Sequence, residues 1–500
     1  MDRMKLSEIY QLFKKITWAL FLLALPVTSF PFFPPALGGE ALVRPLSIYP
    51  MILLVLLVIL PHLITRPIPR TLLPLILFIM VAISTSLLSL LRGIEPVLGI
   101  EVNVRVIRGI LTLAIGCAFY LTVALLPDSI DELQFSMRWI YVGAVIAIFW
   151  GSIQAINILF PDSNWLAFLE RAQSFISIRR LHPERIVGLT YEPHWFAEQI
   201  NLLIIPWSLA AVLTDYSVFC LPKFITRKWP YIKLEWLLLG CSILILPFTY
   251  SRSGLINLVI LIISGLLLFR PRKQIGLLIQ YEKKRIPVLK TNMAMRKLLQ
   301  VLLTSVILFV PIFYIGSKNL FFSRLWNYWR EQNTNMTGYL TSIGLDARVI
   351  YSQAAYRTYE SFPILGVGLG NYAFYFEEML PFRPIAKVPE VLQMITPESG
   401  RDRLITSKNL YLRLLAETGI IGTCTFFAFV IAHLGCAIYL RLSSDRESQY
   451  WGTASILGLI AFATSALTFD SFVIPNMWIV FGLITAATRV TSQTYKTLDY

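Results

Sequence analysis

Long apolar stretches recur along the whole chain, and each is about as long as a helix that crosses a bilayer. A spanning helix needs about 20 apolar residues for about 30 Å of hydrocarbon, and by that measure there are about twelve spans. Their centres lie near residues 25, 56, 81, 117, 149, 203, 243, 262, 308, 425, 461 and 481. The stretches are continuous and do not alternate with polar positions, which excludes a transmembrane β-barrel. We therefore expect an all-α polytopic membrane protein.

Composition agrees with this interpretation. Of the 500 residues, 56% are hydrophobic and 15% are charged, which is too apolar for an ordinary soluble domain. The net charge of +15 is explained by basic cytoplasmic loops, so we expect no nucleic-acid partner. The five cysteines show no CxxC spacing and predict neither a disulfide framework nor a metal site. Residues 17–33, behind a basic start, predict a first spanning helix rather than a cleaved signal peptide.

Basic segments set the expected orientation. With the N-terminus in the cytoplasm, the positive-inside rule is satisfied by the loops 65–70, 222–233, 270–297 and 441–448. The C-terminus is then cytoplasmic as well. The basic loops also predict contact with anionic membrane lipids.

A long segment rich in Tyr, Phe, Trp and Gly separates spans nine and ten. A segment of this length is usually functional or disordered, and its composition predicts a folded external loop domain over the mouth of the bundle. The predicted domains are a transmembrane bundle over residues 1–316 (spans one to nine), the extracytoplasmic loop over 317–407, and spans ten to twelve over 408–500.

The segments expected outside hold many arginines, but only three lysines, Lys318, Lys387 and Lys408. Because the planar guanidinium binds phosphate or carboxylate through two parallel hydrogen bonds, this bias indicates an anionic ligand at the outer face. Pairing of the arginines with external Asp and Glu is the alternative.

Three polar groups stand at expected outer ends of spans: the turn 249–254, the segment 344–376 and the stretch that begins at Lys408. In "TYSRSG", residues 249–254, Arg252 lies in a short turn at the level of a lipid headgroup phosphate, or else it snorkels to the interface. The third group begins at Lys408 and Asn409, which open an apolar helix. On this helix Asn409, Arg413 and Glu417 recur every four residues along one face. Ionisable groups in such a position are functional or paired, and Arg413 with Glu417 is an open pairing.

Residues 344–376 form the second group. An amphipathic helix is expected over 346–360, with Asp346 as its N-cap. One helical stripe of this segment contains Arg348, Ser352, Ala355 and Tyr359. The glycines that follow, together with Asn371, predict a backbone that approaches an anion, or simply a tight turn. These residues are Gly366, Gly368 and Gly370.

A further polar group precedes span six in "RIVGLTYEPHWFAEQ", residues 185–199. Its ionisable members are Arg185, Glu192, His194 and Glu198. A glutamate and a histidine beside an aromatic ring predict sugar binding or acid–base chemistry. A polar start of a helix is the alternative.

Together these segments resemble the O-antigen ligase/O-antigen polymerase superfamily of bacterial envelope proteins. The resemblance lies in the "SRSG" turn, the "DAR" helix before "PILGVGLGNY", the stretch "SKNLYLRLLAETGIIG", and the segment 185–199, which is similar to the Arg–Gly–Glu–Pro segment of polymerase-type members. It covers spans six to ten, with a ligase-like core at residues 185–440. The first five spans match in hydropathy only.

The resemblance implies a glycosyltransferase-C-like helical bundle in the bacterial inner membrane. It implies transfer from an undecaprenyl-diphosphate-linked oligosaccharide to a glycan or lipid-linked acceptor on the outer face, without a nucleotide sugar, a required metal or another cofactor. The two family arginines that hold the donor diphosphate fall on Arg252 and Arg348. A chain-length regulator is a candidate protein partner. Further substrate contacts are expected from Arg185, Asn409, Arg413, Gly366, Gly368, Gly370 and Asn371.

One position departs from the family pattern. Ligase-type members commonly carry a histidine, thought to take the acceptor proton, just before the Asn–Leu–Tyr stretch, where this chain has Lys408. An ordinary lysine is protonated at neutral pH and is no base, so Lys408 is expected to add a third cation to the diphosphate site. This favours a polymerase over a ligase and leaves Glu192, His194 and Glu417 as candidate bases.

Two other classes of protein compete with an enzyme. A lipid-linked oligosaccharide flippase would suit about twelve spans, but many transporters show two matching halves and charges near the bilayer midplane, which this sequence lacks. A membrane sensor or scaffold needs no arginine-rich outer face.

Overall fold

The computed structural model describes residues 2–32, 34, 42–65, 68–182, 184–219, 233–268, 323, 327–330, 335–381, 388–395 and 404–498. Within these ranges the regular elements are helices, joined by turns and a few isolated bridges, so the predicted all-α class is confirmed. The span expected near residue 308, the basic segment 270–297, Lys318 and Lys387 lie outside the described residues.

Six helices are long and apolar enough to cross a membrane, and all six coincide with predicted spans. They are Ile48–Thr65 (α2 to α3), Leu72–Arg92 (α4 with its last turn), Val102–Leu125 (α5), Ile130–Leu159 (α6), Pro193–Thr214 (α8 and α9) and Leu410–Leu442 (α19). Shorter apolar helices, α11 (Leu234–Ile245) and α12 (Arg252–Leu268), lie at the next two predicted positions. Six spans are therefore supported, and the total of about twelve stays a prediction.

The last two helices form the centre of the bundle. Helix α20 (Arg446–Ser465) packs against α19 and α9, and α21 (Pro475–Leu498) packs against α5. Large aromatic side chains fill these contacts, as where the Trp207 and Trp451 rings lie 5.8 Å apart. Such rings bury the most apolar surface per residue and favour edge-to-face geometry, so this part of the core is closely packed.

The first span was predicted wrongly. Helix α1 (Asp2–Leu23) begins in the basic start and ends at Leu23, so residues 17–33 are not one helix. Pro26 and Pro31 lack the backbone N–H that a helix requires, and an irregular segment follows.

The sequence analysis also missed α7 (Ser163–Ser174), which Asp162 caps through Oδ1.

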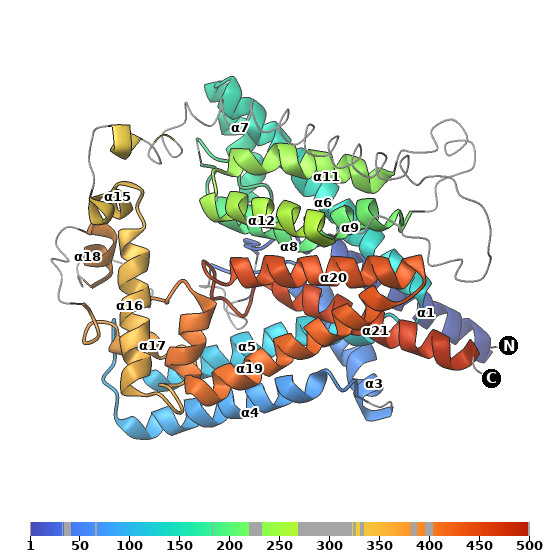
Figure 1. The fold of residues 1–500 in the computed structure, drawn as a ribbon, viewed down its shortest axis with the longest axis horizontal. Coiled ribbons are helices and arrows are strands. Elements are labelled where there is room, and N and C mark those ends of the chain that lie inside the picture. Colours follow the sequence, from blue (N-terminus) through green and yellow to red (C-terminus); the bar gives the residue numbers. More distant parts are fainter. Residues whose placement is uncertain are drawn as a thin grey trace, which may run out of the picture.

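Four helices of the predicted loop domain gather at one end of the bundle. They are α15 (Met336–Ser342), α16 (Asp346–Ser361), α17 (Tyr372–Tyr375) and α18 (Pro389–Ile395). Figure 1 shows α16 standing across the ends of α4 and α19, at the opposite end of the bundle from both chain termini. A small apolar core built around Tyr351, Tyr372 and Phe376 joins α16, α17 and α18 to the first part of α19. The helix predicted over 346–360 is thus present.

Asp346 does not cap this helix, contrary to the prediction. The N-cap position belongs to Leu345, whose side chain makes no capping bond, while Asp346 is the first helical residue. Its carboxylate accepts a hydrogen bond from the neighbouring Ala347 N–H at 2.9 Å. An acidic group in the first turn still favours the positive end of the helix dipole.

Helix α19 is broken at Gly419, whose φ of 61° and ψ of −166° are not helical. The segment 363–368 fills the break. Backbone hydrogen bonds join the two, from Val367 N to Ala416 O (2.9 Å), Gly368 N to Glu417 O (2.8 Å), Ile420 N to Pro363 O (2.8 Å) and Ile421 N to Ile364 O (3.4 Å). The polar groups that the break would leave unpaired are therefore satisfied, as the hydrocarbon region requires.

The break makes Gly419 a position that only glycine fits. A Gly419→Ala change should lower the free energy of unfolding by at least about 1–3 kcal/mol, because a side chain strains this backbone region. Gly435 is the matched control within the same helix, since an added Cβ there meets nothing within 4 Å. Gly435→Ala should be neutral or stabilising by up to about 1 kcal/mol. Thermal unfolding of the purified variants in detergent measures both, and equal melting temperatures would contradict the prediction.

Candidate functional site

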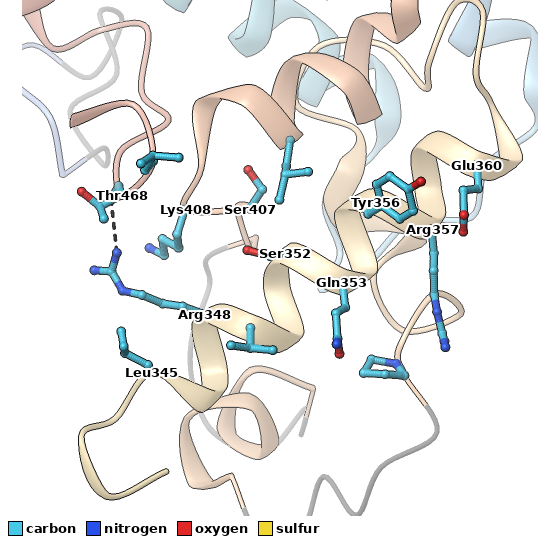
Figure 2. A pocket seen from close by; sticks show the side chains of 14 residues that line it. Leu345, Arg348, Ser352, Gln353, Tyr356, Arg357, Glu360, Ser407, Lys408 and Thr468 are labelled. Atoms are coloured by element: carbon cyan, nitrogen blue, oxygen red, sulfur yellow. Dashed lines mark hydrogen bonds between the residues drawn. The ribbon is translucent and has the colours of Figure 1, made fainter. Parts of the chain in front are cut away.

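A cavity of about 770 Å³ lies between α16 and the start of α19. From α16 it is lined by Arg348, Ser352, Gln353, Tyr356, Arg357 and Glu360. The opposite wall includes Ser407 and Lys408, just ahead of α19, and Thr468, in the turn after α20. Figure 2 shows Arg348 and Lys408 at one end of the cavity, and Arg357 and Glu360 at the other. The cavity therefore has a cationic end and a mixed polar end.

Arg348 is brought to the cavity by the register of α16. The predicted stripe is correct for Arg348 and Ser352, whereas Ala355 is buried and Tyr359 does not line the cavity. The guanidinium donates to the Thr468 carbonyl at 3.4 Å. Burial lowers the pKa of Arg348, while nearby acidic groups raise it. The side chain thus keeps a cation in a half-buried place.

Lys408 sits on a strained stretch of backbone. Its φ of 56° is left-handed, which non-glycine residues adopt rarely. Its N–H donates to Asp470 Oδ2 at 2.9 Å, and the next residue, Asn409, caps α19 by accepting from the Leu412 N–H at 3.1 Å. Asn409 therefore has a structural role, and it and Asp470 hold the backbone that presents Lys408 to the cavity.

Arg413 and Glu417 are paired and buried. Arg413 Nε lies 2.9 Å from Glu417 Oε2, a second nitrogen donates to the Asp470 carbonyl, and the guanidinium stacks over Phe472 at 4.9 Å. The exposed fractions are 8% and 3%. Arg413 and Glu417 thus form an ion pair with each other, which is one of the two open interpretations. Neither side chain lines the cavity.

The glycine segment is bonded into the bundle rather than open to a ligand. Gly366, Gly368 and Gly370 all have positive φ, of 70°, 93° and 79°. Its N–H groups donate to Phe362 O, Ala416 O, Glu417 O and Ser86 Oγ. Side-chain hydrogen bonds also hold the glycine segment. Examples are Arg92 Nη2 to Gly366 O (3.0 Å), Arg105 Nε to Gly370 O (2.8 Å) and Asn371 Nδ2 to Ser89 Oγ (2.7 Å). These bonds support the tight-turn interpretation and fix α16 against α4 and α19.

A second basic group lies beside the turn that precedes α12. Arg185 Nε donates to the Thr249 carbonyl at 3.0 Å, which anchors this turn. Burial, and then repulsion from Arg179 and Arg252, lowers the pKa of Arg185 to about 10. Arg252 is the first residue of α12 and does not line the large cavity. Arg185 thus supports the turn in which Arg252 lies.

Glu192 belongs to this second group and is paired. Its carboxylate forms an ion pair with Arg179, whose guanidinium also lies over the Tyr191 ring at 5.0 Å. Glu192 occupies the N-cap position of α8 without a side-chain capping bond. The ion pair makes it a poor candidate for a free base.

His194 is close to both basic groups. Arg348 and Lys408 of the first group, and Arg185 and Arg179 of the second, lie within electrostatic range of its ring. It also lines a small cavity with Ser253 and Thr468. Because Thr468 lines both cavities, His194 and the start of α12 lie next to the cationic end of the large cavity.

Sequence reasoning missed Thr468 and Asp470. The sequence does carry a signal for Asp470, an aspartate in "TFDSF" between two apolar stretches. Ionisable groups in or near a membrane are usually functional or paired. Thr468 contributes through its backbone carbonyl, for which the sequence has no signal. Among the described residues, no group of three or more His, Cys, Asp or Glu could hold a metal ion.

Comparison with known proteins gives a match to a protein-family model. No curated protein matches the chain. The family model described as O-Antigen ligase matches residues 237–427, a range that includes Arg252, Arg348 and Lys408. The range excludes Arg185, Glu192 and His194. The match supports the resemblance to the O-antigen ligase/O-antigen polymerase superfamily over residues 237–427.

Proposed function

We propose that this protein is an inner-membrane glycosyltransferase that polymerises undecaprenyl-diphosphate-linked glycans on the outer face of the bacterial inner membrane. The observation that carries the proposal is the cavity of about 770 Å³ with Arg348 and Lys408 at one end. A diphosphate suits the cationic end, and a sugar chain suits the row of hydrogen-bonding groups along α16. In this arrangement both chain termini are cytoplasmic and α15 to α18 are extracytoplasmic.

The cations would stabilise the leaving group. As the bond between the anomeric carbon and the diphosphate oxygen breaks, negative charge grows on the diphosphate, and cations already in place stabilise it without rearrangement. Arg348 offers a planar fork to phosphate oxygens, and Lys408 adds a point charge. Arg252 would join them from the start of α12, beside Ser253 and His194.

His194 is the candidate base that best fits the geometry. Glu192 and Glu417 each form an ion pair, whereas no ion pair of His194 occurs in the described part of the chain. Arg348 and Lys408 also lie within electrostatic range of its ring. In the proposed reaction His194 therefore accepts the proton of the attacking sugar hydroxyl. The resulting bond joins that oxygen to the anomeric carbon, and the diphosphate leaves on its lipid.

The far end of the cavity would hold the glycan. Tyr356, Arg357 and Glu360 lie along one face of α16, and Figure 2 shows them away from Arg348. A sugar held there would exclude water from the anomeric carbon and limit hydrolysis. The same face would select the sugar.

A flippase remains the second candidate class, since it too binds a lipid-linked glycan. The paired charges Arg413 and Glu417 lie within a span, as transporter charges do. They are tied to each other and to Asp470, however, and the cavity lies at the end of the bundle that carries α16. The geometry therefore favours the transferase.

The function is tested with purified full-length protein and an undecaprenyl-diphosphate-linked oligosaccharide. We expect new glycosidic bonds and longer lipid-linked chains, detected by mass spectrometry, without a nucleotide sugar. Transfer of the glycan to an added lipid A-core acceptor, with no longer lipid-linked chains, would favour a ligase instead. Movement of the donor across vesicles with no new bond would favour the flippase.

Arg348 should be essential for this reaction. Arg348→Ala is expected to lower turnover at least about a hundredfold, the effect of removing one charge-stabilising donor, and Arg348→Lys should recover only part because it cannot bind in the bidentate manner. Arg446→Ala is the control, since Arg446 is an exposed residue 3.8 Å from Asp215 and such pairs contribute little. Membrane amounts and melting temperatures of all variants are compared first. Full activity of Arg348→Ala would contradict the diphosphate site.

Lys408 should act as a cation and not as a base. Lys408→Ala should lose activity. Lys408→His should regain it relative to Lys408→Ala as the pH falls through about 6.5, the ordinary histidine pKa, because the protonated ring restores the charge. Initial rates from pH 5.5 to 8.5, each normalised to Lys408→Ala at the same pH, measure the effect. A ratio that rises with pH would show that this position serves a base.

A further inference from the structure

A set of buried side-chain oxygen atoms lies beneath His194, where α8, α12 and α20 meet. Glu198 and Asn201 lie on α8 and Asn257 lies on α12, and their exposed fractions are 6%, 0% and 3%. All three line one small cavity of about 10 Å³. The proposed reaction uses none of them.

The hydrogen bonds of the two amides fix which atoms are left over. Asn201 Nδ2 donates to the Gly254 carbonyl at 2.8 Å. Asn257 Nδ2 donates to the Ala461 carbonyl at 3.1 Å and to Ser465 Oγ at 3.0 Å. Each amide thus uses its nitrogen for the protein, while its Oδ1 is buried and has no partner within the described residues.

The carboxyl of Glu198 completes the set. Its Oε1 is also buried and unpartnered, and no ion pair of Glu198 occurs among the described residues. Asn476 of α21 lies against the same carboxyl. An isolated buried carboxylate is strongly unfavourable, so such a group either takes up a proton or gains a compensating positive charge.

The cavity and its oxygens match one small cation. A volume of about 10–15 Å³ is the least that holds a single water-sized species. The donors are a carboxylate, two amide oxygens and the hydroxyls of Ser253 and Ser465 on the same cavity. Oxygen donors select hard cations, and a single carboxylate balances one positive charge, whereas sites for divalent ions usually gather several.

We propose that Glu198, Asn201 and Asn257 form a binding site for a monovalent cation, with Na⁺ as the ion of suitable size. The ion joins α8 to α12, two helices that also pack directly. Because Asn257 lies on the same helix as Arg252, the bound ion holds the first turn of α12 in place beside the large cavity. The binding of the ion can be tested without the glycan and without the proposed reaction.

Purified full-length protein in detergent tests the site without any substrate. Na⁺ is titrated against N-methylglucamine at constant ionic strength, and the melting temperature is recorded. A ligand that binds only the folded state raises this temperature in a saturating manner. We expect such a rise with Na⁺, a weaker one with K⁺, and none for Glu198→Gln, which keeps the shape of the side chain and removes its charge.

Two further variants make the test decisive. Asn201→Ala should shift the Na⁺ response to at least tenfold higher concentration, and it serves if Glu198→Gln does not fold. Glu235→Gln is the matched control: Glu235 is equally buried, but its Oε1 accepts from Ser217 Oγ at 2.8 Å and from the Val218 N–H at 2.9 Å, so its Na⁺ response should equal that of the wild type. A wild-type melting temperature that is independent of Na⁺, or a response retained in both Glu198→Gln and Asn201→Ala, would overturn the proposal.

Discussion

The end of the bundle that carries α16 depends on how the backbone hydrogen bonds lost at the break in α19 are replaced. A helix that stops and restarts within a span exposes N–H and C=O groups that no water can reach in hydrocarbon. Here the segment 363–368 supplies the missing partners on both sides of Gly419. The same segment directly follows α16, so the hydrogen bonds that repair α19 also fix the helix that carries Arg348. The position of the candidate site is therefore a consequence of backbone chemistry.

A second constraint is the balance of buried charge next to this break. Arg413 is compensated by Glu417 and by the carbonyl of Asp470, and the side chain of Asp470 holds the backbone of Lys408. One buried network thus supports Lys408, one of the two cations at the cationic end of the cavity, and Arg413 and Glu417 do so without lining the cavity. Removing one partner of such a network leaves an uncompensated charge, which is far more costly than removing the whole set. Arg413 and Glu417 would therefore affect the reaction mainly through position and folding.

Much of this arrangement could be predicted from the sequence, because hydropathy over about 20 residues reports directly on spanning helices. The helix over 346–360 and the short turn beside Arg252 follow from local patterns, whereas the joint placement of Arg348 and Lys408 is expected only from the family resemblance. The break at Gly419 could not be predicted, since a glycine within an apolar helix is usually tolerated. Its cause lies in a distant segment that inserts there. The glycines of 366–370 suggested an anion site for a similar reason. N–H groups of this segment bond to residues of helices that are distant in the sequence, and the sequence alone does not show these bonds.

The strained backbone of Lys408 is the strongest structural indication that the site binds an anion. A non-glycine residue at positive φ persists only when its surroundings hold it there, and such residues cluster at functional sites. Asp470 and the helix cap at Asn409 hold it from both sides. The conformation turns the side chain toward Arg348 (Figure 2), where two cations would repel each other without an anion between them. Because the fold maintains both the strain and the repulsion, a bound anion is the simplest group that makes the arrangement favourable, and the diphosphate of the proposed lipid-linked donor would supply that anion beside α16.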